Sequence, residues 1–417
     1  MAGSSPTAST GAPAPTRLHL AAAVCALVLL ALVVAFTAWR SGRVLATHGA
    51  HASLAPWRGR IRGLATHRAA LADPTRIPVF GSSELSHDVD FRPDRLFGNA
   101  PSGFTVYPMG EPGVLLMHHV LEAAAIGEQL RGRRVLVFVP PNEFSMRRKS
   151  ERQQFFAGNF SRVQAATMLA QGALPDSLQR DILARLAVYH AALAMDPLIA
   201  AEAQLALRGR SRATTLATAA LQLPMRLEAA WLTIADRVTG ARAVRAHPRR
   251  DRDAVRLRAP IAWDSLEQVA RAEYLPGASS NRYGLPDAYW ERLRGASTDG
   301  GLRHVGERFD RQHEDAAAWG ELELLVRTLA ADGARPLLVC LPLPGLYMDD
   351  TGGNAAGRAD FYAQLRAFAA RAGIPMIDFA SLDARPGLLV DLQTHLSPVG
   401  WLAVDEAIDS VMHGDYY

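Results

Sequence analysis

Two uninterrupted apolar runs, each directly after a helical stretch, constrain the fold of this chain more than any other feature. Val135–Val139 follows a helical pattern over Val114–Leu130, and Pro336–Leu341 follows one over Ala318–Ala330. Apolar runs without polar alternation are typical of strands buried on both faces, which occur in parallel sheets with helical crossovers. The chain is therefore predicted to form an α/β fold around a doubly wound parallel sheet.

Two further runs extend this pattern toward the ends of the chain. Ile77–Phe80 is a short β-type run that stops at Gly81, and Ile374–Phe379 follows a helical pattern over Phe361–Ala372. Strands that alternate with helices in this way belong to one sheet. We therefore expect one folded domain over residues 75–417.

The middle of this domain has a different character. Between about residues 145 and 319 the chain is rich in Ala, Leu, Arg and Gln and has long helical stretches, such as Ser177–Leu193 and Leu198–Leu207. We interpret this part as a large helical insertion. Within it, Thr214–Ile234 is apolar enough to resemble a membrane span, but four polar or helix-breaking residues interrupt it. These are Gln222, Pro224, Arg226 and Glu228. A core helix and a helix on the membrane surface both remain open.

An apolar segment near the N-terminus predicts a membrane anchor. From Leu20 to Trp39 the only clearly polar side chain is Thr37, and about twenty such residues span a bilayer core. We predict a transmembrane helix over 18–39, a flexible tail over 1–17 and a connector over 40–74. A cleaved signal peptide is the alternative, but the segment is long for one and no clean Ala-x-Ala site follows it.

The charges around the anchor bear on its orientation. One arginine precedes the segment, and five follow it closely: Arg17 before, and Arg40, Arg43, Arg58, Arg60 and Arg62 after. Counted literally, this distribution would keep the large domain in the cytoplasm.

Composition excludes several classes of protein. The 417 residues are 49% apolar, enough for a large core, and the net charge of +4 comes from scattered arginines. Because no basic patch interleaved with aromatic residues occurs, no nucleic-acid partner is expected. Cys25 lies in the apolar segment and Cys340 in a predicted strand, so a disulfide between them is not expected.

Three side chains suited to serine chemistry lie at the ends of this domain. Ser83 comes just after the first predicted strand, and His395 lies four residues after Asp391. A serine needs a base to take its proton and a third group to orient that base. Ligands in open α/β sheets bind at the carboxyl ends of the strands, so these residues can meet there.

Two further residues could stabilise an oxyanion. Asn142 follows the Val135–Val139 strand and offers an amide donor, and Gly110 offers a backbone N–H without a side chain in the way. Together with the backbone N–H of Ser83 they form a candidate oxyanion hole.

Each of these residues also has a structural interpretation. Ser83 could cap the helix that follows it, and His395 could be a core histidine. His87, His118 and His119 lack a third ligand at a recognisable spacing, so neither a metal site nor a cofactor is expected.

Several short segments, in this order, resemble one known family over most of the chain. They are Phe80–Leu85, Pro140–Phe144, Asn281–Leu285, Leu341–Tyr347 with Asp350–Gly352, and His395–Leu396 with Gly400–Trp401. The chain resembles the DltD family of D-alanyl-transfer proteins, membrane-anchored relatives of the SGNH (GDSL-like) serine esterases. This resemblance implies an SGNH-hydrolase-like fold on the periplasmic or extracellular side of the cytoplasmic membrane, which conflicts with the arginine count.

The resemblance also implies roles for individual residues. Ser83 would be the nucleophile and His395 the base. Ser82 stands where many esterases have aspartate. The usual acid lies three residues before the histidine, where this chain has Leu392, so Asp391 would act from one position earlier.

The implied function is transfer of D-alanine, through a serine acyl-enzyme, to a hydroxyl of an envelope glycopolymer of the teichoic acid or lipopolysaccharide type. The implied partners are a membrane-bound O-acyltransferase and a D-alanyl carrier protein. Two alternatives stay open: an esterase or thioesterase that acts on the D-alanyl carrier or on mischarged acyl groups, and a non-catalytic scaffold that recruits the carrier protein.

Overall fold

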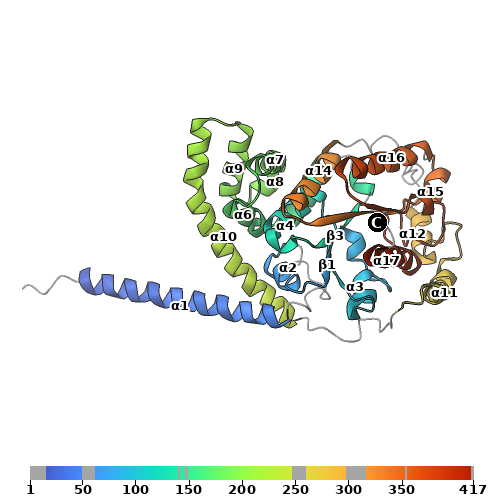
Figure 1. Ribbon diagram of the computed structural model, residues 1–417, viewed down its shortest axis with the longest axis horizontal. Helices are drawn as coiled ribbons and strands as arrows, with labels where there is room; N and C mark the ends of the chain where they lie inside the picture. The colour runs from blue at the N-terminus through green and yellow to red at the C-terminus, as the bar shows by residue number, and fades with distance from the viewer. Residues whose placement is uncertain are drawn as a thin grey trace, which may run out of the picture.

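The computed structural model describes residues 16–48, 62–139, 141–145, 149–246, 260–296, 316–352 and 355–414. Figure 1 shows one long helix, α1, projecting from a domain whose other elements surround a sheet. Residues 1–15 of the predicted tail lie outside the described part.

The sheet has five strands, all parallel, in the order β2-β1-β3-β4-β5. The strands are β1 (Arg76–Phe80), β2 (Thr105–Met109), β3 (Arg134–Val139), β4 (Arg335–Cys340) and β5 (Met376–Asp378). This arrangement confirms the predicted parallel α/β fold. The order reverses between β1 and β3, and such a switch point leaves a crevice at the carboxyl ends of these two strands.

Strand β2 was not among the predicted strands. Its sequence, Thr-Val-Tyr-Pro-Met, is short and is not an uninterrupted aliphatic run, and Pro108 cannot donate a hydrogen bond to a sheet. The strand nevertheless forms because it lies at the edge of the sheet and pairs only with β1.

Both faces of the sheet are covered by helices. In β3, Val135 and Val137 belong to one buried cluster, whereas Leu136 and Phe138 belong to another on the opposite face. The first cluster includes residues of α4 (Leu116–Ile126), α14 (Ala316–Ala331) and α16 (Ala355–Ala372), and the second includes residues of α17 (Pro398–His413). Burial on both faces explains the uninterrupted apolar run of β3.

Between β3 and β4 the described residues form helices and turns but no strand. The α-helices of these described residues are α5 (Lys149–Asn159), α6 (Arg162–Gln171), α7 (Asp176–Leu186), α8 (His190–Leu193), α9 (Pro197–Leu207), α10 (Arg212–Ala246), α11 (Trp263–Tyr274) and α12 (Asp287–Ala296), followed by α14. A buried polar cluster links α5 to α14 and to the turn after β3: Arg152 of α5 lies 3.1 Å from Glu321 of α14 and 3.4 Å from Glu143. The domain limits given above stay predictions.

Helix α1 (Thr16–His48) is longer than the predicted anchor. Its most apolar stretch has a mean hydropathy of 2.8 and is not covered by any other described residues, so it fits a single-pass membrane anchor. Its C-terminal end belongs to the folded domain, because Val44 and Leu45 pack with Ala241 and Val244 of α10. A short helix, α2 (Ala65–Ala70), lies in the predicted connector.

Candidate active site

The local fold displays Ser83 at the carboxyl end of β1. The strand ends at Phe80, and Ser83 begins a single turn of 3-10 helix over Ser83–Leu85. The neighbouring Ser82 faces elsewhere, because its hydroxyl donates to the Val114 carbonyl at 2.9 Å. The residue that precedes the turn as its cap is Ser82, without a side-chain capping bond, so Ser83 is not a helix cap.

Ser83, His395 and Asp391 lie in one hydrogen-bonded chain. His395 Nε2 is 2.7 Å from Ser83 Oγ, and His395 Nδ1 is 2.6 Å from Asp391 Oδ2. A carboxylate only accepts hydrogen bonds, so the proton of a neutral imidazole belongs on Nδ1, and Nε2 is left to accept from the serine hydroxyl. This is the orientation that a general base for Ser83 requires.

The longer spacing between the acid and the histidine is accommodated by a tight loop. At its base, Val390 N–H donates to the His395 carbonyl at 2.9 Å. At its tip, Asp391 Oδ1 accepts the N–H groups of Gln393 at 2.8 Å and of His395 at 3.3 Å. Thr394 takes a positive φ of 67°, which is rare for a β-branched residue. This turn of the backbone takes up the extra residue and brings Asp391 Oδ2 to the imidazole.

The electrostatics favour a charged Asp391. Burial opposes its ionisation, but the hydrogen bond and charge of His395 outweigh burial and hold the pKa of Asp391 below its ordinary value. His87 packs edge-on against His395 with ring centroids 4.8 Å apart. Burial, followed by the nearby charge of His395, lowers the pKa of His87, so His87 is uncharged near neutral pH.

His87, Asp391 and His395 also offer ligand atoms that lie within 4.8 Å of one another. Sequence reasoning did not find this group, because His87 precedes the other two by about three hundred residues. Both ring nitrogens of His395 already contact Ser83 and Asp391. A cation bound to either nitrogen would therefore break the hydrogen-bonded chain.

The two adjacent histidines of α4 have different contacts. His118 Nδ1 accepts the Leu115 N–H at 2.8 Å and its Nε2 lies 3.0 Å from the Phe156 carbonyl. Burial lowers the pKa of His118 to about 4, so it is a neutral structural group. His119 points instead toward the turn that carries Ser83, with Nε2 2.7 Å from the Gly81 carbonyl.

His119 belongs to a buried polar chain behind that turn. Its Nδ1 lies 2.9 Å from Glu122 Oε2, and the other oxygen of Glu122 lies 2.8 Å from His67 Nε2. His67 Nδ1 in turn lies 3.0 Å from the Tyr107 hydroxyl. The Gly81 carbonyl and the ionised Glu122 carboxylate both offer hydrogen-bond acceptors to the His119 ring. In the sequence, the only sign of this network of polar side chains was the spacing of His119 and Glu122, which lie three residues apart on one helix.

Replacing Glu122 by glutamine is expected to lower the free energy of unfolding by about 2 kcal/mol, because it leaves buried imidazole groups without a charged acceptor. Burial raises the pKa of Glu122, but His67 and His119 outweigh it and hold the pKa below its ordinary value. The stabilisation is therefore complete above the ordinary pKa of a glutamate. It is lost as the pH falls through the lower pKa that Glu122 has in the folded protein. Urea unfolding of both proteins at several pH values measures this. A difference that stays constant into acid would contradict the expectation.

The backbone of Gly110 lies against the segment that leads into Ser83. Gly110 directly follows β2, and Gly81 N–H donates to the Met109 carbonyl at 3.3 Å. A Cβ at Gly110 would come within 2.7 Å of the Ser82 carbonyl oxygen and 2.8 Å of Gly81 backbone atoms. Asn142 lies in the turn that follows β3, Pro141–Ser145, and its side chain is outside the described residues. The oxyanion roles of Ser83, Gly110 and Asn142 stay predictions.

The substitution Gly110→Ala is expected to reduce turnover by about 10-fold to 100-fold, because the new methyl group meets backbone atoms that cannot rotate away and shifts the turn that carries Ser83. The measurement is turnover of an ester substrate, with Gly277→Ala as the matched control. A Cβ at Gly277 would meet nothing within 4 Å. Equal turnover for the two variants would show that the approach of Gly110 to the turn is unimportant.

Residues of the helical insertion contact the loop that carries Asp391 and His395 (the histidine loop). These contacts were not predicted from the sequence. The Tyr274 hydroxyl donates to the Leu389 carbonyl at 3.0 Å, and the Tyr289 hydroxyl accepts the Leu392 N–H at 3.3 Å. The Asn281–Leu285 segment contributes through Tyr283, whose carbonyl accepts the Gly387 N–H at 3.1 Å. The role of this segment is therefore positional.

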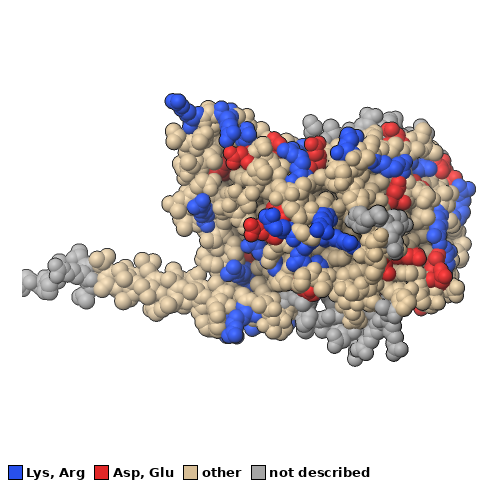
Figure 2. All heavy atoms as spheres, in the orientation of Figure 1, with Lys and Arg blue, Asp and Glu red and all other residues tan. Residues whose placement is uncertain are grey.

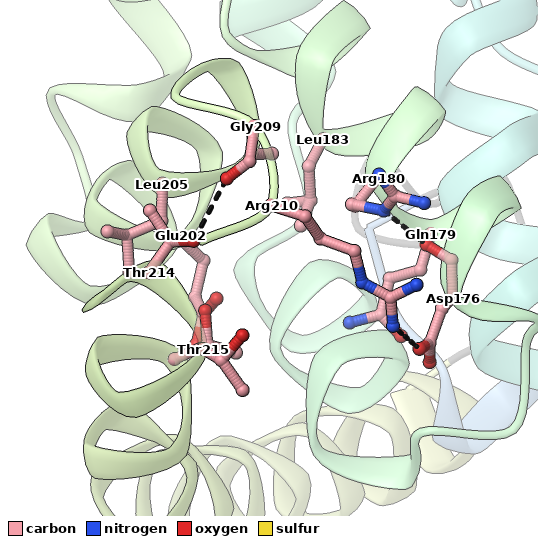
Figure 3. Close-up of a pocket in the computed structure, with 12 residues that line it drawn as sticks. Asp176, Gln179, Arg180, Leu183, Glu202, Leu205, Gly209, Arg210, Thr214 and Thr215 are labelled. Carbon is pink, nitrogen blue, oxygen red and sulfur yellow. Dashed lines mark hydrogen bonds and ion pairs between the residues drawn. The ribbon is translucent and has the colours of Figure 1, made fainter. Parts of the chain in front are cut away.

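A separate hollow of about 180 Å³ lies within the insertion, between α7, α9 and the start of α10. Figure 3 shows Glu202 and Thr215 on one side of it and Arg210 bonded to Asp176 on the other. Burial raises the pKa of Glu202 to about 7. The lining includes no histidine or cysteine, so the hydroxyl–imidazole contact seen between Ser83 and His395 has no counterpart there.

Comparison with known proteins matches most of this chain to one family. The family model described as "DltD protein" matches residues 58–413. "Protein DltD" of Bacillus subtilis (strain 168) is 25% identical over 389 residues, which cover 93% of this chain and 95% of the relative. "Protein DltD" of Staphylococcus aureus (strain NCTC 8325 / PS 47) is 22% identical over 346 residues, covering 81% of each chain.

Proposed function

The chain belongs to the DltD family, and from this premise we propose that it transfers D-alanine, as an ester, to a hydroxyl of an envelope glycopolymer. The observation that carries the proposal is the hydrogen-bonded chain of Ser83, His395 and Asp391 at the carboxyl end of β1. An alignment of hydroxyl, imidazole and carboxylate serves acyl transfer. It would have no purpose in a scaffold that only recruits a carrier protein.

In the first half of the reaction His395 Nε2 takes the proton of Ser83 as Oγ attacks the D-alanyl carbonyl carbon. A tetrahedral intermediate forms, and its oxyanion would be held by the backbone N–H groups of Ser83 and Gly110 with Asn142. The imidazolium, stabilised by Asp391, then gives its proton to the leaving group. The bond from the carbonyl carbon to the donor breaks, and the alanyl group stays on Ser83 as an ester.

In the second half the same histidine removes a proton from the acceptor hydroxyl, whose oxygen attacks the alanyl ester. Ser83 leaves and recovers its proton from His395, and the polymer carries the new ester. The free amine of the alanyl group reduces the negative charge of the envelope. With water in place of the polymer, the same residues would hydrolyse the acyl-enzyme, so the identity of the product distinguishes a transferase from an esterase or thioesterase.

The proposed location follows from the same assignment. The acceptor is outside the cytoplasm, so the domain after α1 is proposed to face the periplasmic or extracellular side, against the arginine count, and to receive D-alanine from a carrier-protein pathway through a membrane-bound O-acyltransferase. A fusion of alkaline phosphatase after Tyr417 should be active. An inactive phosphatase together with a fluorescent cytoplasmic reporter would reverse the orientation and favour a thioesterase that acts on the carrier protein.

The function itself is tested by the alkali-labile D-alanine content of the isolated envelope. We expect a deletion strain to lose these esters and the intact chain to restore them. Fractionation of the envelope before alkali treatment then identifies whether a teichoic acid or a lipopolysaccharide carries them. An unchanged ester content after deletion would remove D-alanine transfer from consideration.

A further inference from the structure

Helix α10 carries an apolar stripe that nothing in the described part of the chain covers. Its members recur at intervals of seven, four and four residues, which places them on one side of a helix. They are Leu216, Leu223, Leu227 and Trp231, with exposed fractions of 71%, 66%, 64% and 62%. Large apolar side chains exposed as a continuous stripe mark a surface that binds something.

The opposite side of α10 is fixed to the domain. Met225 and Ala229 are fully or almost fully buried there. Asp236 Oδ2 accepts the N–H groups of Leu64 at 2.9 Å and of Ala65 at 2.6 Å, at the start of α2. Between Thr214 and Ile234 only Met225 and Ala229 are buried, so α10 is not a core helix. Its stripe keeps one orientation relative to the domain.

The stripe lies on the same helix as the contact with the membrane anchor. Near its C-terminal end α10 packs through Ala241 and Val244 against Val44 and Leu45 of α1. Figure 1 shows α10 along the side of the domain from which α1 projects. Figure 2 shows almost no charged side chains along the projecting part of α1, and basic side chains among uncharged ones along the edge that α10 occupies. A bilayer crossed by α1 would therefore meet the domain on the side of α10.

The charges on α10 suit an anionic surface. Its exposed charged residues are all arginines: Arg212, Arg226, Arg237, Arg242 and Arg245. Its two carboxylates are turned inward. Glu228 lies 2.6 Å from Arg162 of α6, and Asp236 binds the start of α2. Helices with leucine and tryptophan on one face, bordered by arginine, lie in the interface of membranes that contain anionic lipids.

We propose that α10 lies in the interface of the bilayer that α1 crosses, with its stripe at the boundary between headgroups and acyl chains and its arginines at the lipid phosphates. Trp231 occupies the interface, as Trp39 does on α1. A single anchor leaves a domain free to rotate about the membrane normal and to tilt. Attachment along α10 as well removes that freedom and fixes the height of the Ser83 site above the leaflet.

Depth-dependent quenching tests this on the full chain. In a Cys25→Ser background, where Cys340 is buried, Leu227→Cys is labelled with the fluorophore NBD and the protein is reconstituted in vesicles of phosphatidylglycerol and phosphatidylethanolamine. The control is Ala367→Cys, an exposed position on α16. Lipids with a nitroxide near the headgroup should quench the label at position 227 at least about twofold more than the label at 367.

Leu223→Cys provides a second label and should behave like position 227. Because both side chains are exposed, neither substitution disturbs the core. Quenching at 223 and 227 no greater than at 367 would overturn the proposal. The proposal would also be overturned if the labels at 223 and 227 were shielded from water only when a membrane-bound O-acyltransferase is reconstituted with the chain. The stripe would then bind a protein rather than lipid. The assay follows position rather than acyl transfer, so it is independent of the proposed function.

Discussion

The substitution Ser83→Ala is expected to reduce acyl transfer by at least about 10³-fold, because the oxygen that would carry the alanyl group is removed. In cells, Ser83→Ala at matched expression should leave the envelope without alkali-labile D-alanine. In the purified protein it should abolish the covalent acyl-enzyme, which mass spectrometry of the intact chain detects as one added alanyl group. The fold should be unaffected, because the contact of the hydroxyl given by the structure is with His395 at 2.7 Å.

The neighbouring Ser82 supplies a matched control. Its hydroxyl donates to the Val114 carbonyl at 2.9 Å and takes no part in the hydrogen-bonded chain. Ser82→Ala should therefore retain transfer within a few-fold. If Ser83→Ala restored the esters fully while the deletion strain lacked them, Ser83 would be no nucleophile, and the scaffold that recruits the carrier protein would become the better account.

The parts of the fold that depend on local pattern could be predicted. The β3 and β4 runs are apolar throughout because both faces of the sheet are buried, and the sequence records this directly. Strand β2 escaped prediction because its five residues, which begin with Thr105, do not form a long uninterrupted apolar run, and its pairing with β1 is a tertiary contact that no local pattern reveals. The family motif pointed to Ser83 and His395 as partners. Their hydrogen bond itself could not be predicted from local sequence, because the two residues lie 312 positions apart along the chain.

The supporting residues of the site depend on contacts that have no sequence signature. His67 and Glu122 meet from separate elements, and Tyr289 reaches the histidine loop from the insertion. The spacing of Asp391 is the most instructive case. Its reach to His395 depends on the positive φ of Thr394, and a threonine gives no sign of a conformation that glycine or asparagine usually adopts.

The substitution Asp391→Asn is expected to reduce turnover by about 10³-fold to 10⁴-fold with little change in substrate binding. The reason lies in the two oxygens of this carboxylate. Oδ1 accepts N–H groups from Gln393 and His395, so the amide oxygen of asparagine would keep that position. The amide NH2 would then face His395 Nδ1 and donate to it. The imidazole proton would move to Nε2, which could no longer accept the proton of Ser83.

This prediction separates orientation from folding. Because Asp391→Asn keeps both backbone hydrogen bonds of the loop, the thermal midpoint should change by no more than a few degrees while turnover collapses. Leu392→Asn, at the position where the usual acid would lie, is the matched control. Its side chain is absent from the hydrogen-bonded chain, so turnover should fall far less. Retention of turnover by Asp391→Asn within about threefold would mean that another group orients His395, and the assignment of Asp391 as the acid would be withdrawn.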